Sequence, residues 1–231
     1  YDVVRNDIKA ILPQKGWDDG SIGPILVRLA WHTSGTYDKT TKTGGSDGAT
    51  MRYSIEANDP ANAGLEHARA FLEPIKEKHS WISLVSIEAM GGPTIPWKHG
   101  RKDKPESASP PNGRLPDAEK GASHIREVFY RDRSGYERGW TFTETRFNNQ
   151  FYVMLTRLDW QEEKLPNGLI QYGNKKLMML PSDMAFLHDP QFSEIVKIYA
   201  NNKETFFEDF AAAFGKLLEL GVNREEDEAK L

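Results

Sequence analysis

The sequence predicts a mostly α-helical protein. Apolar residues recur at helical spacing in several segments, so that each of these segments can bury one side of a helix. Long loops separate the segments, at residues 36–50, 91–117 and 164–176. These loops are too extended for a helix bundle with tight turns, and we therefore expect them to be shaped around a ligand.

Two helices are expected near the N-terminus. The first has one apolar face made of Val3, Val4, Ile8 and Ile11. Residues 13–20 begin with proline and end with glycine, and they break this pattern. Pro24 stands where it can open the second helix, which runs through Ile25–Trp31.

Further helical patterns follow. An apolar stripe predicts a third helix, with Pro74 expected to kink its end; it consists of Leu65, Ala68, Phe71, Leu72 and Ile75. Residues 125–129 form a short amphipathic piece. A long C-terminal helix is expected to end at Gly221, and its apolar side is lined by Phe206, Phe207, Phe210, Phe214, Leu217 and Leu218.

Composition limits the classes of function. The chain has 231 residues, of which 38% are hydrophobic and 28% charged, as in an ordinary soluble globular protein. The net charge of −4 argues against nucleic acid as the main partner. No run of eighteen apolar residues predicts a membrane span, and no secretory or other targeting peptide is recognisable in the printed chain. Because there is no cysteine, disulfides, thiolate metal sites and cysteine nucleophiles are excluded.

The strongest chemical signal lies in the second helix. Arg28, Trp31 and His32 are spaced so that all three project from one side of it. A neutral imidazole can take a proton from one peroxide oxygen and return it to the other, while a guanidinium stabilises the negative charge that develops as the O–O bond breaks. From spacing alone, the commoner interpretation of this triplet is a surface arginine, a core tryptophan and a hydrogen-bonded histidine.

The neighbouring residues favour the chemical interpretation. Residues 27–36, Val-Arg-Leu-Ala-Trp-His-Thr-Ser-Gly-Thr, closely resemble the distal-helix signature of the intracellular, class I haem peroxidases. The resemblance covers nearly the whole chain in the family's order, and its further motifs lie at residues 44–46, 58–65, 91–97, 113–118, 134–137 and 177–183. Within this family the chain is most similar to the fungal cytochrome c peroxidases, followed by the ascorbate peroxidases.

The resemblance implies a haem-peroxidase fold. A distal lobe is expected over residues 1–122 and a proximal lobe over residues 123–231, around one buried haem b. By the same resemblance His32 is the distal acid–base, Arg28 the charge stabiliser, Trp31 the indole over the iron and Asn62 the acceptor of the second ring N–H of His32. Alone, Asn62 would be interpreted as a helix N-cap. Positions that match contacts with the haem or its propionates are Pro24, Ile25, Val27, Pro116, Asp117, Ser134 and Leu180.

The proximal side is implied by two further residues. Trp140 matches the proximal tryptophan that carries an oxidising equivalent as a radical, and Asp183 matches the buried aspartate that bonds both this indole and the iron-bound imidazole. Without the resemblance, Trp140 would be interpreted as a core aromatic residue and Asp183 as the N-cap of a short helical segment.

The chain departs from the family in two places. Between Arg131 and Asp132 it lacks roughly 25–30 residues, enough for a helix with its flanking loops, and this helix carries the family's iron-ligating histidine. About ten residues are also absent between Ser83 and Leu84, inside an expected buried helix. None of the six histidines falls in a matching proximal motif, so the sequence predicts no metal ligand, and the five besides His32 are expected to face solvent or cap an element.

Two interpretations of these departures are open. Either the printed sequence omits residues that the protein contains, or the protein truly lacks them. Loss of a core helix would cost far more than a single truncation does, against a total stability of about 5–15 kcal/mol. We therefore favour the first interpretation.

The resemblance offers two electron donors for the reduction of hydrogen peroxide. Asp18 and Asp19 resemble an acidic docking site for a basic cytochrome c, and Asn148 stands where ascorbate peroxidases have a potassium-binding aspartate. Arg133 matches an ascorbate-binding arginine, and this match favours ascorbate as the donor instead. We expect ferrocytochrome c as the first donor and ascorbate as an alternative or second one. A non-enzymatic peroxide or haem sensor is the alternative of another class. Residence in the mitochondrion, in the intermembrane space or the matrix, is implied by the resemblance alone.

Overall fold

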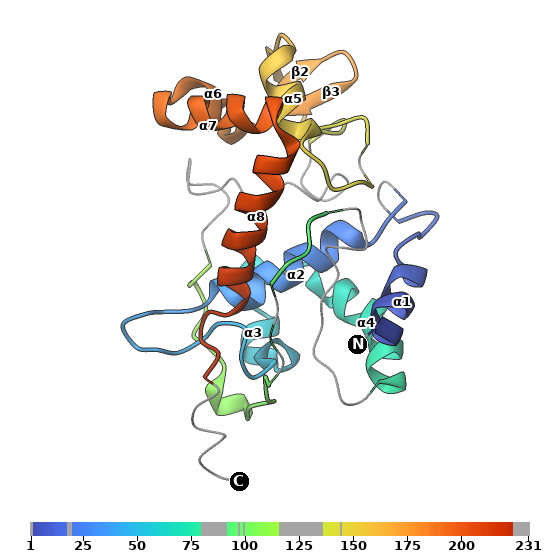
Figure 1. Cartoon of the computed structure of the whole chain (residues 1–231), viewed down its shortest axis with the longest axis vertical. Coiled ribbons are helices and arrows are strands. Elements are labelled where there is room, and N and C mark those ends of the chain that lie inside the picture. The colour runs from blue at the N-terminus through green and yellow to red at the C-terminus, as the bar shows by residue number, and fades with distance from the viewer. Residues whose placement is uncertain are drawn as a thin grey trace.

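Helices make up most of the structure, a computed structural model that describes residues 2–17, 20–79, 92–96, 98, 100–115, 136–143 and 145–223. Figure 1 shows two groups of elements joined by one long helix. The first group contains α1 (Asp2–Ile11), α2 (Gly23–Gly35), α3 (Ser54–Ala57) and α4 (Leu65–Lys78). The second contains α5 (Gln150–Arg157), α6 (Pro181–His188) and α7 (Pro190–Asn201). The helix between them is α8 (Lys203–Leu218), and short 3-10 turns lie at η1 (Thr50–Arg52), η2 (Pro60–Asn62) and η4 (Glu106–Ala108).

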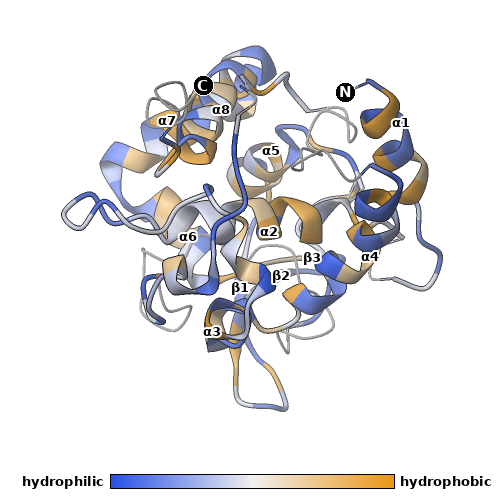
Figure 2. Cartoon of the chain, turned by 90° about the horizontal axis from the view of Figure 1, so that it is seen from below, coloured by the Kyte–Doolittle hydropathy of each residue, from blue (hydrophilic) through white to orange (hydrophobic). Residues whose placement is uncertain are grey.

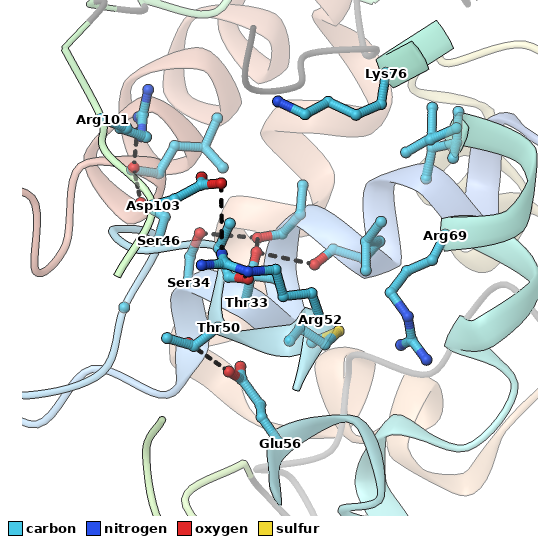
Figure 3. A pocket seen from close by; sticks show the side chains of 18 of the residues that line it. Thr33, Ser34, Ser46, Thr50, Arg52, Glu56, Arg69, Lys76, Arg101 and Asp103 are labelled. Atoms are coloured by element: carbon cyan, nitrogen blue, oxygen red, sulfur yellow. Dashed lines mark hydrogen bonds and ion pairs between the residues drawn. The ribbon is translucent and has the colours of Figure 1, made fainter. Parts of the chain in front are cut away.

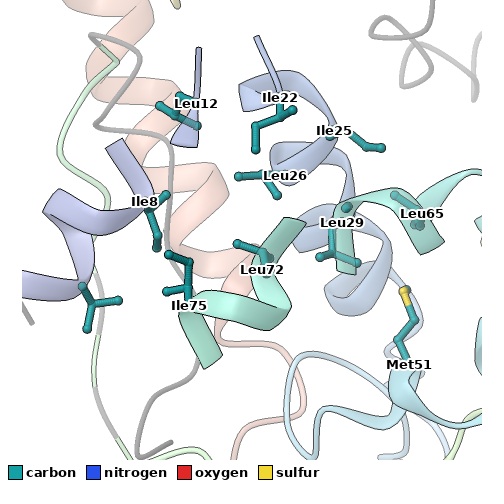
Figure 4. Packing of buried hydrophobic residues seen from close by; sticks show 12 residues of the cluster. Ile8, Leu12, Ile22, Ile25, Leu26, Leu29, Met51, Leu65, Leu72 and Ile75 are labelled. Carbon is teal, nitrogen blue, oxygen red and sulfur yellow. The ribbon is translucent and has the colours of Figure 1, made fainter. Parts of the chain in front are cut away.

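The N-terminal core confirms the helices expected from spacing. Pro24 stands in the first turn of α2, where a missing N–H costs no hydrogen bond. Side chains of α1, α2 and α4 meet in one apolar cluster (Figure 4), which contains Val4, Ile8, Leu12, Ile22, Ile25, Leu26, Leu29, Met51, Leu65, Ala68, Leu72 and Ile75. The inclusion of Val3 in the buried face was wrong, because this residue lies on the outer side of α1 and is 61% exposed. The helix α4 continues past Pro74 as far as Lys78.

One predicted loop is instead a sheet. Residues 164–176 contain the last residue of β1 and the whole of β2, in an antiparallel three-stranded sheet of β1 (Gln161–Lys164), β2 (Ile170–Asn174) and β3 (Leu177–Met179). The hairpin turn between β1 and β2 is closed by the N–H of Leu165, which donates to the carbonyl of Leu169 at 2.8 Å. Gly168 in this turn has a φ of 89°, which glycine adopts without strain. The loop prediction was wrong because the strands are short and β1, Gln-Glu-Glu-Lys, contains no apolar residue.

The C-terminal helix holds the two groups together. α8 packs against α2 at one end and α7 at the other, and its Phe206 and Phe214 are buried. Asn202 caps its first turn by accepting a hydrogen bond from the N–H of Thr205 at 3.0 Å. Beyond its last turn, the N–H of Ser46 donates to the carbonyl of Leu220, so the loop after α2 is tied to the end of α8.

The helix α2 is largely buried. Most residues of α2 are apolar, and it lies near the centre of the view in Figure 2, with hydrophilic residues on the helices around it. In the part of the chain that the structure describes, no helix has the length and apolarity needed to cross a membrane.

Candidate active site

His32 stands at the centre of a buried hydrogen-bond chain. Its Nδ1 lies 2.9 Å from Oδ1 of Asn62, and Nδ2 of Asn62 donates to the backbone carbonyl of Glu56 at 2.8 Å. Because the Glu56 carbonyl can only accept, the amide must present its oxygen to the imidazole. Nδ1 of His32 therefore donates, and Nε2 is left as the basic nitrogen.

The environment keeps this imidazole neutral. Burial, and after it the positive charge of Arg28, lower the pKa of His32 from 6.5 to about 4, against the opposite effect of the bond to Asn62. Nε2 is buried and has no hydrogen-bond partner among the described residues. A neutral base with an unused nitrogen can take a proton from a ligand that enters this site.

Arg28 is held by the same loop that holds Asn62. Its two terminal nitrogens donate to the carbonyls of Ala61, at 2.9 Å, and Ala63, at 3.0 Å. These two residues flank Asn62, so one turn of chain orients both the amide and the guanidinium. Asp59 stabilises the turn by accepting a hydrogen bond from the N–H of Ala61.

Trp31 completes the distal group. Its ring meets the imidazole of His32 edge to face, with centroids 4.4 Å apart and an interplanar angle of 78°. The indole is partly buried against Val27, Ile95 and Phe214. The structure thus brings Arg28, Trp31, His32 and Asn62 into one cluster, although Asn62 lies thirty residues from His32 in sequence.

A second buried group joins Trp140 and Asp183. Nε1 of Trp140 donates to Oδ2 of Asp183 at 2.8 Å, and the same oxygen accepts the N–H of Leu180 at 2.8 Å. Burial raises the pKa of Asp183 from 3.8 to about 6, against the effect of these two donors. The other carboxylate oxygen, Oδ1, is buried without a hydrogen-bond partner in the described part of the chain.

The unexpected sheet positions this second group. The N–H of Met178, in β3, donates to the carbonyl of Gly139 at 2.8 Å, which fixes the backbone immediately before Trp140. β3 then leads through Leu180 into α6, whose first turn carries Asp183. Sequence reasoning also missed Gln171, which is fully buried in β2 and accepts the N–H of Glu137 at 3.1 Å. A glutamine directed inward from a strand is the signal that could have revealed it.

Arg138 has a backbone conformation that glycine adopts freely. Its φ is 74°, in the left-handed region, which costs a residue with a Cβ roughly 1 kcal/mol or more. Its side chain forms an ion pair with Glu163 of β1.

Comparison with known proteins decides the family. The family model described as peroxidase matches residues 4–135. An Aspergillus fumigatus protein that bears the provisional name heme-binding peroxidase is 49% identical over 269 aligned positions, which cover 99% of this chain and 84% of that protein. The chain belongs to the peroxidase family.

Two relatives carry more specific names. A Yarrowia lipolytica protein provisionally named mitochondrial cytochrome c peroxidase is 49% identical, over 98% of this chain and 92% of the relative. The mitochondrial cytochrome c peroxidase of Aspergillus fumigatus is 46% identical, over 96% of this chain and 69% of the relative. The similarity to class I haem peroxidases is therefore confirmed, and this peroxidase is a haem-dependent oxidoreductase.

The relatives are longer within the aligned region. The alignment with the first Aspergillus protein has 269 positions, 38 more than the 231 residues of this peroxidase. At least 38 positions of that alignment therefore have no counterpart in this chain.

The unpartnered atoms of the two buried groups have the chemistry that a haem site requires. The distal side offers a basic nitrogen, Nε2 of His32, and the proximal side offers a carboxylate oxygen, Oδ1 of Asp183, which calls for an N–H donor. A carboxylate that accepts the second ring N–H of an iron-bound imidazole is the usual outer partner of such a ligand.

The predicted haem contacts lie in different surroundings. Pro24 stands in the first turn of α2, Ile25 packs into the N-terminal core, and Val27 packs against Ile95 and Phe214. Leu180 precedes α6 and packs with Trp140. Pro116, Asp117, Ser134, Arg133, Asp18 and Asp19 lie outside the described residues, as do the two positions at which the chain departs from the family.

A cavity of about 450 Å³ lies on another side of α2 (Figure 3). The α2 residues that line it are Leu26, Leu29, Ala30, Thr33 and Ser34. None of its described lining residues is a member of the distal cluster, so this cavity is separate from the reactive side of the helix.

Of the two alternatives expected for His79, the structure shows a cap, because its backbone N–H donates to the carbonyl of Ile75 at the end of α4. His79 is buried, and its Nε2 lies 2.5 Å from a carboxylate oxygen of Asp7 in α1. This contact ties the end of α4 to α1.

Proposed function

We propose that this peroxidase reduces hydrogen peroxide to water with electrons from ferrocytochrome c, which reach the site through a radical on Trp140. The observation that carries the proposal is the hydrogen bond from Trp140 to a buried carboxylate, that of Asp183, on a chain whose distal helix also holds a neutral histidine. Haem b, when bound, supplies the iron at which the oxidising equivalents of peroxide are taken up.

The distal residues account for the protons. Nε2 of His32 would accept a proton from one peroxide oxygen and return it to the other, which leaves as water. The proton needs a base that is neutral at physiological pH, and His32 is such a base because burial holds its pKa near 4. Arg28 supplies a fixed positive charge for the departing oxygen, and Trp31 lies beside the imidazole as a further donor.

The proximal residues account for the electron. Removal of an electron from the indole of Trp140 leaves a positive charge, and the Asp183 carboxylate lies 2.8 Å from the ring nitrogen. With a pKa of about 6, Asp183 is mainly ionised at neutral pH and so stabilises that charge. Trp140 and Asp183 are therefore assigned to electron transfer.

We infer that the iron-ligating histidine lies in residues absent from the printed chain, between Arg131 and Asp132. The unpartnered Oδ1 of Asp183 supports this inference, and so do the 38 or more unmatched positions in the alignment. The intact mass of the protein purified from its source tests it. A mass clearly above 26.2 kDa supports additional residues, whereas a mass of 26.2 kDa refutes them.

We propose that the haem lies between two lobes of the chain. Residues 1–122 form the distal lobe and residues 123–231 the proximal lobe. Contacts to the haem are assigned to Pro24, Ile25, Val27, Pro116, Asp117, Ser134 and Leu180. The names of the relatives support a mitochondrial location for the protein.

The loop after Trp140 favours cytochrome c over ascorbate as the electron donor. Nδ2 of Asn148 donates to the hydroxyl of Thr143 at 2.8 Å, and Oδ1 of Asn148 accepts the N–H of Gln150 at 2.8 Å. Both ends of the amide thus close the loop. The side chain carries no negative charge that could bind a cation, and a bound cation would oppose the positive charge of an indole radical. Ascorbate remains the alternative donor because of Arg133.

Steady-state turnover with each donor tests the proposal. The haem-loaded protein is given hydrogen peroxide with reduced cytochrome c, and separately with ascorbate. Continued cytochrome oxidation that exceeds ascorbate oxidation is expected. Faster turnover with ascorbate would assign the reaction to the other donor, and a single oxidation followed by a stall would identify a sensor.

A further inference from the structure

Three aromatic rings meet where α5, α7 and α8 pack together. The ring of Tyr152, in α5, lies 5.2 Å from that of Tyr199, in α7, and the two meet edge to face. Phe206, in α8, contacts both, at 5.0 Å and 5.5 Å between centroids. Ring contacts at this separation are close enough to couple neighbouring aromatic groups.

The inner end of this chain of rings reaches the core around Trp140. Tyr152 packs against the buried cluster that contains Trp140, Leu155 and Met178. Burial also raises the pKa of the Tyr152 hydroxyl, so this phenol is not ionised at physiological pH.

The outer end has a proton acceptor. The hydroxyl of Tyr199 donates to Oδ2 of Asp209, an exposed carboxylate on α8, at 2.9 Å. A phenol that loses an electron becomes strongly acidic, so its oxidation requires a base to which the proton can move. The carboxylate of Asp209 is placed to accept that proton, and it is exposed to solvent.

Exposed apolar residues lead along α7 to Tyr199. Phe192 and Ile195 are 42% and 45% exposed, and they precede Tyr199 by seven and four residues, on the same side of the helix. An aromatic molecule can rest on such a surface beside the tyrosine ring.

We propose that Tyr199 is a second, surface site of one-electron oxidation, at which electron-rich phenols serve as reductants. An electron passes from Tyr199 through Tyr152 to the oxidised indole of Trp140, the O–H bond of Tyr199 breaks, and the proton moves to Asp209. The resulting phenoxyl radical takes one electron and one proton from a phenol, which leaves as its own phenoxyl radical, while Asp209 releases its proton to water. The inference rests on the proposed radical at Trp140.

Spin trapping locates the site without a measurement of turnover. The haem-loaded protein is mixed with hydrogen peroxide and a nitroso spin trap but no donor, and the adducts are located by mass spectrometry of its peptides. An adduct on Tyr199 is expected, with a loss of about tenfold in Tyr152→Phe and in Asp209→Asn. Guaiacol oxidation should fall by a similar factor in Tyr199→Phe, while cytochrome c oxidation is unchanged.

Tyr172 provides the matched control. It packs against the same core, and its hydroxyl also donates to a carboxylate, Glu162, at 3.0 Å, but it is not in contact with the ring of Tyr152 in the described interactions. Tyr172→Phe should leave the Tyr199 adduct and guaiacol oxidation unchanged. If Tyr172→Phe lowers the adduct and guaiacol oxidation as much as the other variants do, this inference alone is overturned. The same holds if no adduct forms on Tyr199 while cytochrome c oxidation proceeds. If the unaltered protein oxidises neither guaiacol nor cytochrome c, the proposed function is overturned as well.

Discussion

Nδ1 of His32 lies 2.9 Å from Oδ1 of Asn62, and the amide of Asn62 is oriented by the carbonyl of Glu56. This arrangement determines which ring nitrogen carries the proton. It leaves Nε2 as a base in a position where burial and Arg28 together keep the ring uncharged. The proposed role of His32 therefore depends on Asn62, to which no contact with peroxide is assigned.

Asn62→Asp should move the acid limit of the peroxide reaction upward. A carboxylate beside the imidazole stabilises the imidazolium, so the pKa of His32 rises from about 4 and the base is lost at a higher pH. The second-order rate constant of the haem-loaded protein with peroxide, measured as a function of pH, checks this. Asn62→Leu is the matched variant, because it removes the acceptor without adding charge. It should lower the rate constant without an upward shift, and a shared upward shift in both variants would contradict the electrostatic explanation.

Trp140→Phe should abolish cytochrome c oxidation and spare the reaction with peroxide. The phenyl ring fills much of the same buried space, but it is far harder to oxidise and has no N–H for Asp183. Stopped-flow mixing with peroxide and steady-state cytochrome oxidation separate the two steps. Trp160→Phe is a suitable control, since Trp160 packs in the same cluster and its indole donates to the backbone carbonyl of Leu155 instead of a carboxylate. Retained cytochrome turnover in Trp140→Phe would rule out the indole as relay.

Two buried groups should change the stability of the haem-free chain in opposite directions over one pH range. Asp183 has a folded pKa of about 6 against 3.8, so its contribution to the free energy of unfolding falls as pH rises from about 4 to 6. His32 has a folded pKa of about 4 against 6.5, so its contribution falls as pH drops from 6.5 to 4. At 1.36 kcal/mol per pKa unit, each effect is about 3 kcal/mol.

Urea unfolding between pH 4 and 6.5 separates these contributions. Relative to the unaltered chain, Asp183→Asn should gain stability as pH rises, and His32→Leu should gain stability as pH falls. Asp159→Asn, at an exposed position, should change neither slope. Parallel curves for Asp183→Asn and the unaltered chain would mean that this carboxyl titrates normally.

Local sequence patterns predicted the helices better than the contacts between them. α2 was predictable because Pro24 and the apolar spacing are local features, and the charge-bearing side of this helix follows from the same spacing. Val3 was misplaced because an apolar stripe does not tell which of two adjacent valines faces the core. The sheet was missed because β1 is almost entirely polar, although Pro166, Asn167 and Gly168 form a recognisable turn signal.

The site could be predicted as a set of residues but not as a geometry. The resemblance named His32 and Asn62, whereas the orientation of the amide depends on the Glu56 carbonyl, six residues away on another turn. Likewise, Trp140 is held by a backbone hydrogen bond between Gly139 and Met178, and only the folded chain brings these two residues together.

The most direct test of the account is the second-order rate constant for hydrogen peroxide in His32→Leu. If Nε2 of His32 carries the proton between the two oxygens, the haem-loaded variant should react slower by about 10²–10⁴-fold or more, while the same substitution at the exposed His188 leaves the rate constant unchanged. A His32→Leu rate constant equal to that of the unaltered protein would contradict the assignment of this residue as the distal base.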